Sequence, residues 1–312
     1  MIEIEHLTKR YGETIVVDDV SLRVEEGTIA VVVGTSGAGK STLLRMINRL
    51  VEPSSGRVLI DGRDTLSIPE DELRHRIGYV IQAYGLFPHR TVSQNIATVP
   101  RLLGWDRKKI AARVDELLDL FQLDPGEFAG KFPHELSGGQ QQRVGVARAL
   151  AAKPAVLLMD EPFGALDPVI RSKAQDDLLA IQRRLGATIV LVTHDMNEAF
   201  HLGDRIAVMD QARLLQYAAP AELLTHPAEP FVEQLTGTAE RPFRLLSLTR
   251  VKEALEPGDA EGEALVLSTT LHDALARLIA LGKDALPVID ASGKAVGRIT
   301  VERILAHGRL PA

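Results

Sequence analysis

A glycine-rich segment, Gly34 to Thr42, has the residue types and spacing that hold nucleotide phosphates. It follows the apolar run 29–33 and precedes a second apolar run. In a strand, loop and helix of this kind, the glycines let successive backbone N–H groups point at phosphate oxygens, Lys40 reaches the outer phosphates and Ser41 offers a hydroxyl to Mg²⁺. A glycine-rich turn that matches by chance is the alternative, which the flanking apolar runs disfavour. The predicted nucleotide-binding residues are Gly34, Thr35, Ser36, Gly37, Ala38, Gly39, Lys40, Ser41 and Thr42.

Two adjacent carboxylates, Asp160 and Glu161, close the continuous apolar run 156–159. A run of this kind is typical of a buried parallel strand, and neighbouring side chains at its end project in different directions. Asp160 is therefore suited to hold Mg²⁺, and Glu161 to polarise an attacking water as a general base. Paired carboxylates are also common in turns, so the prediction depends on the glycine-rich loop earlier in the chain.

Two further polar residues follow predicted strands. Gln82 ends the apolar segment 77–82, and His194 follows the apolar segment 187–192. Ligands of open α/β sheets bind at the carboxyl ends of the strands, so Gln82 is placed to meet Mg²⁺ or the attacking water. His194 is placed to bind the γ-phosphate or the water. Without the phosphate loop, each would be interpreted as an ordinary surface or structural residue.

A second anion site is predicted at the start of a helix that follows Leu136. Ser137 is a favourable N-cap, and the glycines at 138 and 139 leave the N–H groups and the positive end of the helix dipole uncovered. One chain already has a complete phosphate loop, so we expect Ser137, Gly138, Gly139 and Gln140 to serve a nucleotide held by another copy. An ordinary capped helix is the alternative.

The elements that must position these residues are those of an α/β fold. Alternation of apolar and polar residues in 2–7 and 20–24 predicts an antiparallel β region before the phosphate loop. Between these strands, Tyr11 is expected on a loop, where its ring could stack on an adenine or simply pack. From about 93 to 122, apolar residues at helical spacing predict a helical insertion where a partner could dock.

Composition limits the class of protein. The 312 residues include 45% hydrophobic and 25% charged residues, which is typical of a globular protein, and no apolar run approaches the length of a membrane span. No export signal is expected at the N-terminus, and the absence of cysteine suits a reducing compartment. The net charge of −6 argues against nucleic acid as a partner.

These motifs resemble, in order, those of the ATPase subunit of ATP-binding-cassette transporters, over residues 1 to about 236. The resemblance implies a P-loop ATP-binding cassette with a mixed sheet core, an antiparallel β subdomain and a helical subdomain at about 88–152. It implies that Tyr11 stacks on adenine and that the loop containing Asp167 crosses a dimer. It assigns catalysis to Glu161, His194 and Gln82, and Mg²⁺ to Ser41, Gln82 and Asp160.

The same resemblance implies an assembly. Two copies are expected to face head to tail with ATP and Mg²⁺ between them, so that ATP binding closes the homodimer and hydrolysis opens it. Membrane permease subunits and a periplasmic or lipid-anchored solute-binding protein are the expected partners. The chain is expected on the cytoplasmic face of the inner membrane, as a peripheral ATP hydrolase coupled to transport.

The segments 46–50, 52–56, 85–89 and 95–97 are similar to those of importers for quaternary-amine osmoprotectants, such as glycine betaine, choline or carnitine. The alternatives are an ATPase that imports another solute, such as an amino acid, or a soluble cassette protein without a transport role. A soluble cassette protein usually has a long coiled-coil insertion or two cassettes, which this chain lacks.

The remaining chain is expected to form a linker at 237–263 and a small α+β domain at 264–307. Its order of strand, helix, strand pair and helix resembles a cystathionine-β-synthase-type (CBS-like) regulatory motif. Such motifs usually work in pairs, and this segment holds only one. It either pairs across the homodimer or merely packs.

Overall fold

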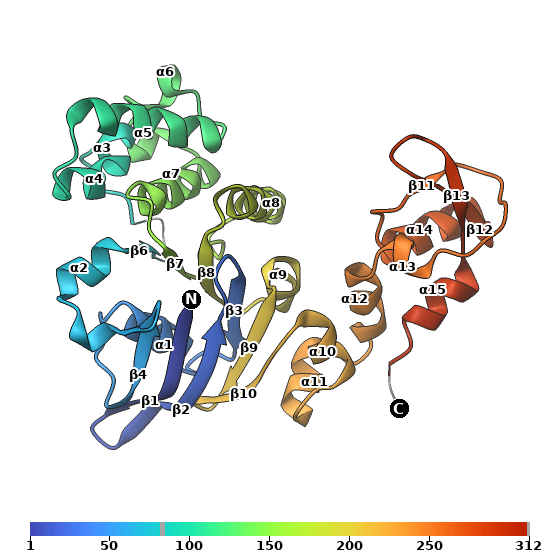
Figure 1. Ribbon diagram of the computed structural model, residues 1–312, viewed down its shortest axis with the longest axis horizontal. Coiled ribbons are helices and arrows are strands. Elements are labelled where there is room, and N and C mark those ends of the chain that lie inside the picture. Colours follow the sequence, from blue (N-terminus) through green and yellow to red (C-terminus); the bar gives the residue numbers. More distant parts are fainter. Residues whose placement is uncertain (82–84, 311–312) are drawn as a thin grey trace. The chain divides into compact units, whose positions relative to one another are not determined.

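The computed structural model describes residues 1–81 and 85–310 (Figure 1). The chain divides at Tyr217 and Ala218 into two compact units. The first unit contains the phosphate loop and the predicted carboxylates. The cassette was expected to extend to residue 236, whereas the division of the structure falls at Tyr217. The functional domain boundaries stay a prediction.

The main sheet of the first unit has, among the described residues, six strands in the order β10-β9-β3-β8-β7-β6. Neighbouring strands from β9 to β6 are parallel. Every residue of β3, β7 and β8 is buried, which explains their continuous apolar sequences. The strands are β3 Ile29–Gly34, β6 Ile77–Val80, β7 Val156–Asp160, β8 Thr188–Thr193, β9 Arg205–Asp210 and β10 Arg213–Ala218.

A second sheet is antiparallel and has, in the described part of the chain, the order β2-β1-β4-β5. Its strands are β1 Ile2–Tyr11, β2 Thr14–Val24, β4 Ser55–Ile60 and β5 Arg63–Asp64. The antiparallel region is therefore present, but the first two strands are longer than expected. Tyr11 is the last residue of β1, not a loop residue, because β1 and β2 stay paired up to Tyr11 and Thr14.

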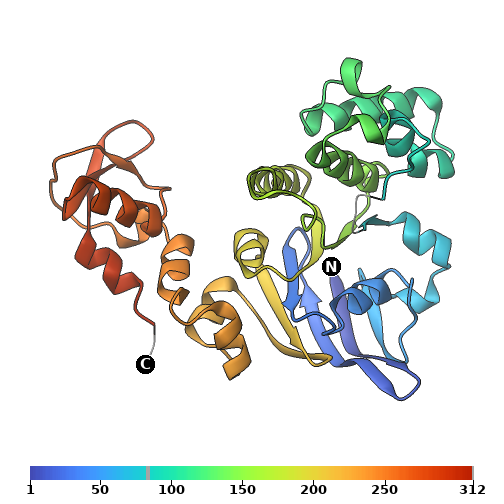
Figure 2. The same cartoon turned by 180° about the vertical axis from the view of Figure 1, so that it is seen from behind.

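Helix α1, Lys40–Ile47, begins directly after the phosphate loop and packs between the two sheets (Figures 1 and 2). Its buried Leu43, Leu44 and Met46 belong to one apolar core with residues of both sheets. Helices α8, Pro168–Leu185, and α9, Met196–Leu202, connect β7 to β8 and β8 to β9. The core thus fixes the start of α1 beside the carboxyl ends of the central strands.

The predicted helical insertion is also present. Val114, Leu117, Leu118 and Phe121 are buried, as their spacing predicted. The helices of this region are α3 Val92–Ile96, α4 Thr98–Leu102, α5 Arg107–Leu120, α6 Pro125–Phe128 and α7 Gly138–Leu150, with a 3₁₀ turn at Pro133–Glu135. Helix α2, Glu70–His75, and a 3₁₀ turn at Thr65–Ser67 lie outside it, between β5 and β6.

The second unit combines helices with a sheet of order β11-β12-β13 in the described residues. Two helices, α12 and α13, occupy part of the segment expected as a linker. The strand and helix order after residue 264 is the expected one, and the resemblance to a CBS-like motif stays a prediction. The elements are α10 Pro220–Thr225, α11 Pro230–Thr236, α12 Arg241–Leu248, α13 Val251–Ala254, β11 Leu265–Val266, α14 Leu271–Leu281, β12 Ala285–Ile289, β13 Ala295–Thr300 and α15 Val301–His307.

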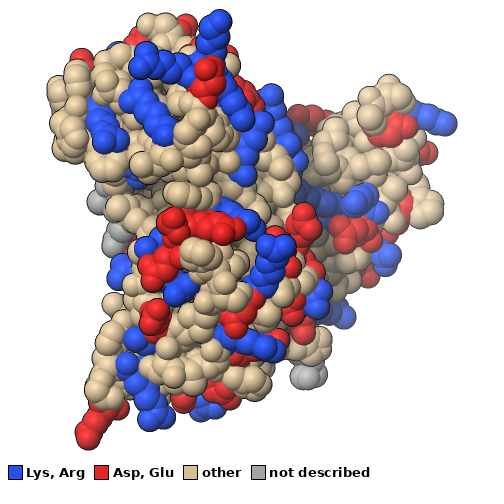
Figure 3. Space-filling model, turned by 60° about the vertical axis from the view of Figure 1, so that its left-hand side comes forward, with Lys and Arg blue, Asp and Glu red and all other residues tan. Residues whose placement is uncertain are grey.

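The surface carries charges of both signs, as the face in Figure 3 shows. In the described part of the chain, no helix combines the length and apolar character needed to cross a membrane.

Candidate active site

At two positions of the phosphate loop, Gly34 and Gly39, the backbone leaves room only for glycine. Gly39 caps α1 with a φ of 93°, and a Cβ added there would lie 2.1 Å from the Val16 carbonyl oxygen. A Cβ at Gly34 would lie 1.9 Å from the Met209 carbonyl oxygen. The loop therefore lies against β2 on one side and β9 on the other, and side chains at 34 and 39 would push it out of place.

Lys40 is buried at the start of α1, with 6% of its surface exposed. Its ammonium donates to the backbone oxygens of Gly34, at 2.9 Å, and Thr35, at 2.7 Å. Burial lowers the pKa of Lys40, while the charges of Glu161 and Asp160 act in the opposite direction. The loop thus holds its cation centrally, within reach of a phosphate chain in the adjoining cavity.

Ser41 and Asp160 come together although they lie far apart in the sequence. The Ser41 hydroxyl donates to Oδ1 of Asp160 at 2.7 Å. Asp160 ends β7 and is 4% exposed. On the other side of the carboxylate, Arg45 of α1 approaches Oδ2 at 3.4 Å. The two residues predicted to hold Mg²⁺ are therefore adjacent at the carboxyl end of the sheet.

Glu161 and His194 form a second close pair. Nδ1 of His194 lies 3.4 Å from Oε2 of Glu161. The Glu161 backbone has a φ of 46°, which is unusual for a residue with a side chain, and its N–H donates to the Val192 carbonyl at 2.9 Å. The two adjacent carboxylates therefore have different partners: Asp160 contacts Ser41 and Arg45, and Glu161 lies beside His194.

These residues surround a cavity of about 380 Å³. It combines a cation, a hydroxyl, a carboxylate and an imidazole with backbone N–H groups at a helix start, which suits a phosphorylated ligand. The lining residues are Val16, Ser36, Gly37, Gly39, Lys40, Ser41, Thr42, Glu161 and His194.

Several predicted site residues do not line this cavity. Tyr11 is 52% exposed at the end of β1, with the Lys9 ammonium 4.9 Å from its ring centre. Ser137 caps α7 in a capping box with Gln140, and Asp167 caps α8. Gly138 and Gly139 begin α7. Gln82 lies outside the described residues.

The sequence analysis missed four residues that contact the site. Val16 lines the cavity from β2, and Asp210, at the end of β9, accepts the Thr35 hydroxyl at 2.7 Å. Arg45 contacts Asp160, and Tyr79 lies near enough to both for them to act on its pKa. The role of Arg45 could have been predicted from the sequence, because it lies four residues after the predicted site residue Ser41 and residues four apart share a helix face. The other three depend on contacts between distant segments.

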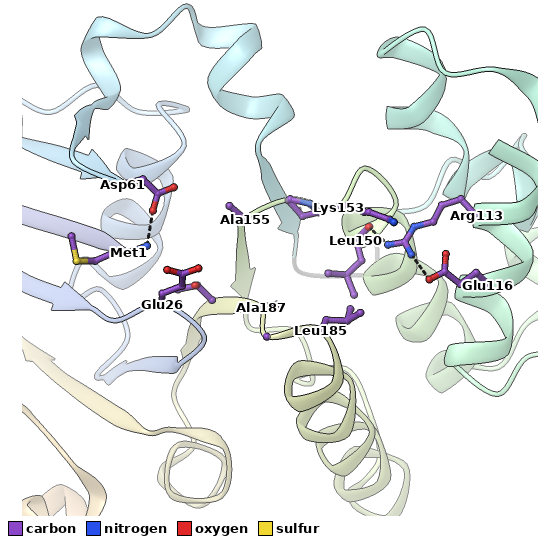
Figure 4. A pocket seen from close by; sticks show the side chains of 13 residues that line it. Met1, Glu26, Asp61, Arg113, Glu116, Leu150, Lys153, Ala155, Leu185 and Ala187 are labelled. Atoms are coloured by element: carbon purple, nitrogen blue, oxygen red, sulfur yellow. Dashed lines mark hydrogen bonds and ion pairs between the residues drawn. The ribbon is translucent and has the colours of Figure 1, made fainter. Parts of the chain in front are cut away.

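A second cavity, of about 340 Å³, lies at the opposite edge of the sheet, where β7 and β8 begin (Figure 4). Ala155 and Ala187 form its middle, between the Met1–Asp61 ion pair and the Arg113–Glu116 ion pair. Ligands of parallel sheets bind at the carboxyl ends of the strands. This cavity lies at the amino ends and contains none of the predicted site residues.

Known proteins identify the family. A family model described as ABC transporter matches residues 17–164. The glycine betaine uptake system ATP-binding protein YehX of Escherichia coli (strain K12) is 50% identical over 308 residues, which cover 98% of this chain and 100% of that protein. The chain belongs to the ABC transporter family. Another member, the osmoprotectant import ATP-binding protein OsmV of Salmonella typhimurium (strain LT2), is 46% identical over 95% of this chain and 78% of its own length.

Solved structures agree with this membership. The dimeric ATP-binding cassette MJ0796, in a post-hydrolysis state bound to ADP and Pi, is 35% identical with a TM-score of 0.62, over 70% of this chain and 98% of that chain. The ABC transporter ATPase fold predicted from the sequence is confirmed, as is an ATP-binding, ATP-hydrolysing transporter subunit. Membership implies that this ABC transporter subunit dimerises and works with membrane permease partners.

Proposed function

We propose that the chain is the ATP-hydrolysing subunit of an importer for a quaternary-amine osmoprotectant of the glycine betaine, choline or carnitine type. The observation that supports this solute class is the extent of the similarity. The glycine betaine and osmoprotectant relatives match nearly the whole chain, including the second unit, and not only the cassette that all family members share.

The phosphate loop would bind the ATP phosphates through its backbone N–H groups and Lys40. Lys40 donates to two loop carbonyls, so phosphate binding would exchange these neutral acceptors for negatively charged phosphate oxygens. The nearby charges of Glu161 and Asp160 favour the positive form of Lys40, against the effect of its burial.

The residues fit a magnesium site. Ser41 and Asp160 offer a hydroxyl and a carboxylate 2.7 Å apart, and both are the oxygen ligands that Mg²⁺ prefers. In the described residues, no group of three or more His, Cys, Asp or Glu side chains could hold a metal by itself. This agrees with Mg²⁺, which commonly takes one or two protein ligands and completes its shell with phosphates and water. Mg²⁺ would supply positive charge to the phosphate oxygens.

Glu161 would accept a proton from the attacking water, as a general base. Its carboxylate lines the cavity and lies 3.4 Å from the His194 ring. His194 would then hold the water or the γ-phosphate in line with Glu161. The assignment of Gln82 to Mg²⁺ and water is a proposal that rests on its position in the sequence alone.

The remaining predicted residues would act across a dimer. Ser137, Gly138, Gly139 and Gln140 lie at the N-terminus of α7 and Asp167 at that of α8, and none of them lines the cavity of their own chain. We infer that they contact the nucleotide of a second copy. Tyr11, exposed at the end of β1, would stack on the adenine.

The partners would be permease subunits and a periplasmic or lipid-anchored solute-binding protein, with this chain at the cytoplasmic face of the inner membrane. The cassette would extend functionally to residue 236, and the CBS-like segment at 264–307, which follows it, would serve regulation.

Glu161→Gln tests the proposed chemistry. It keeps the shape of the side chain but removes the base, so ATP hydrolysis should fall at least a hundredfold, while ATP with Mg²⁺ should hold the variant as a dimer in size-exclusion chromatography. Glu13→Gln, at an exposed turn position, is the matched control. Hydrolysis by Glu161→Gln at the control's rate would show that Glu161 is not the base.

A further inference from the structure

The carboxylate of Asp160 is held by residues that have no assigned role. Its oxygens face different groups: Oδ1 accepts the Ser41 hydroxyl at 2.7 Å, and Oδ2 lies 3.4 Å from Nη2 of Arg45. Tyr79 lies near both groups, close enough for Arg45 and Asp160 to act on the pKa of its hydroxyl. One oxygen of Asp160 thus faces the phosphate loop and the other faces a guanidinium, with a phenol nearby.

The positions of these residues follow from the fold. Ser41 and Arg45 are four residues apart on α1 and therefore share one face of the helix. Tyr79 lies on β6, which is the neighbour of β7 in the sheet, with Tyr79 opposite Leu158. Asp160 ends β7, two residues later. Helix α1 and two adjacent strands therefore bring the three side chains around one carboxylate.

Asp160 is more deeply buried than the two residues beside it, Arg45 and Tyr79. The Asp160 side chain is 6% exposed, so it depends on protein donors for its hydrogen bonds. The Arg45 side chain is 50% exposed, and an ion pair at that exposure contributes little to stability. Tyr79 is half-buried, and a tyrosine hydroxyl is protonated at neutral pH and able to donate a hydrogen bond.

We propose that Arg45 and Tyr79 are positioning residues for magnesium binding: they hold Oδ2 of Asp160 so that Oδ1 stays turned toward Ser41. The proposal rests on the proposed role of Ser41 and Asp160 as magnesium ligands. The second contact shell of a metal ligand fixes its orientation, and the loss of such a contact typically lowers metal affinity about 10- to 100-fold.

The test measures metal affinity separately from turnover. The full chain is saturated with a non-hydrolysable ATP analogue and titrated with Mg²⁺, and analogue binding is measured again with the metal chelated. Arg45→Met and Tyr79→Phe should each weaken Mg²⁺ binding about tenfold or more and leave metal-free analogue binding unchanged. Arg45→Lys, which keeps the charge, should recover part of the loss.

Matched controls are available elsewhere in the chain. Arg57 is an ion-paired arginine with similar exposure, 55%, on β4, and Tyr217 is a half-buried tyrosine on β10. Arg57→Met and Tyr217→Phe should leave Mg²⁺ affinity unchanged.

The outcomes separate this inference from the proposed function. Asp160→Asn should abolish the effect of Mg²⁺ on analogue binding, and if it does not, the assigned magnesium site is wrong. If Asp160→Asn has this effect but Arg45→Met and Tyr79→Phe stay within twofold of the wild type, the positioning role is refuted. Equal weakening of analogue binding with and without Mg²⁺ would refute it as well.

Discussion

Replacement of Glu198 by glutamine should stabilise the protein at alkaline pH. Glu198 lies on α9 and is 5% exposed. One of its oxygens, Oε2, accepts the Thr193 hydroxyl at 2.7 Å, and the other, Oε1, has no hydrogen-bond partner among the described residues. Burial raises its pKa to about 7, the negative charges of Asp195 and Glu161 add to this, and Arg171 opposes it.

The sign of the effect follows from the direction of this pKa change. The ordinary pKa of a glutamate is 4.5, so between 4.5 and about 7 the folded chain holds a proton that the unfolded chain has lost. Stability must therefore fall as the pH rises through this window, and stay low above it. At about 1.4 kcal/mol for each pH unit, the loss is on the order of 3 kcal/mol.

The assay is denaturant unfolding of the wild type and of Glu198→Gln between pH 5 and pH 8.5. Glutamine keeps an acceptor for Thr193 and carries no charge, so the difference in unfolding free energy should grow by about 2–3 kcal/mol in its favour as the pH rises. Glu13→Gln, at an exposed turn position, should show no such trend. A difference that stays flat from pH 5 to 8.5 would refute the reasoning.

Two further predictions concern the phosphate loop and the helical region. Gly39→Ala places a Cβ 2.1 Å from the Val16 carbonyl oxygen, at a φ that favours glycine. ATP affinity should therefore fall at least tenfold in a fluorescent-nucleotide titration, and unchanged affinity would contradict the loop geometry. Arg113 is 5% exposed and donates to the backbone oxygens of Leu150 and Ala151 at the end of α7. Arg113→Met removes both hydrogen bonds of the guanidinium, although the Leu150 carbonyl keeps the N–H of Lys153 at 3.0 Å, and it should cost about 1–3 kcal/mol in denaturant unfolding. A loss below about 0.5 kcal/mol would show that the contacts contribute little.

The sequence predicts the phosphate loop well because the requirement is local. The loop between β3 and α1 is specified by consecutive residues, and each has a chemical reason to be there. The pairing of Ser41 with Asp160 could also be anticipated, since strands that end in polar residues meet at one edge of a parallel sheet.

The position of Tyr79 near Asp160 could not be predicted in the same way. It depends on β6 being the neighbour of β7, which is a property of the sheet order and not of either segment. The same holds for Asp210 and Val16, which reach the loop from β9 and β2.

The start and end of helix α8 could have been predicted from the sequence, but its capping residues were not interpreted in this way. Asp167 was interpreted only as part of a loop that crosses a dimer. It also caps α8, Pro168 takes the first helical position, and Gly186 ends the helix with a φ of 63°. This is the start and stop pattern typical of a helix. A residue that is predicted to have a function, such as Asp167, can therefore also have an ordinary structural role as a helix cap.

Solute-stimulated ATP hydrolysis tests the central claim most directly. The chain is reconstituted in proteoliposomes with its permease and solute-binding partners, and hydrolysis is measured with glycine betaine, choline, carnitine or an amino acid outside. We predict that a quaternary amine stimulates hydrolysis severalfold and that Glu161→Gln removes the response. Stimulation by an amino acid alone, or none by any quaternary amine, would contradict the proposed solute class.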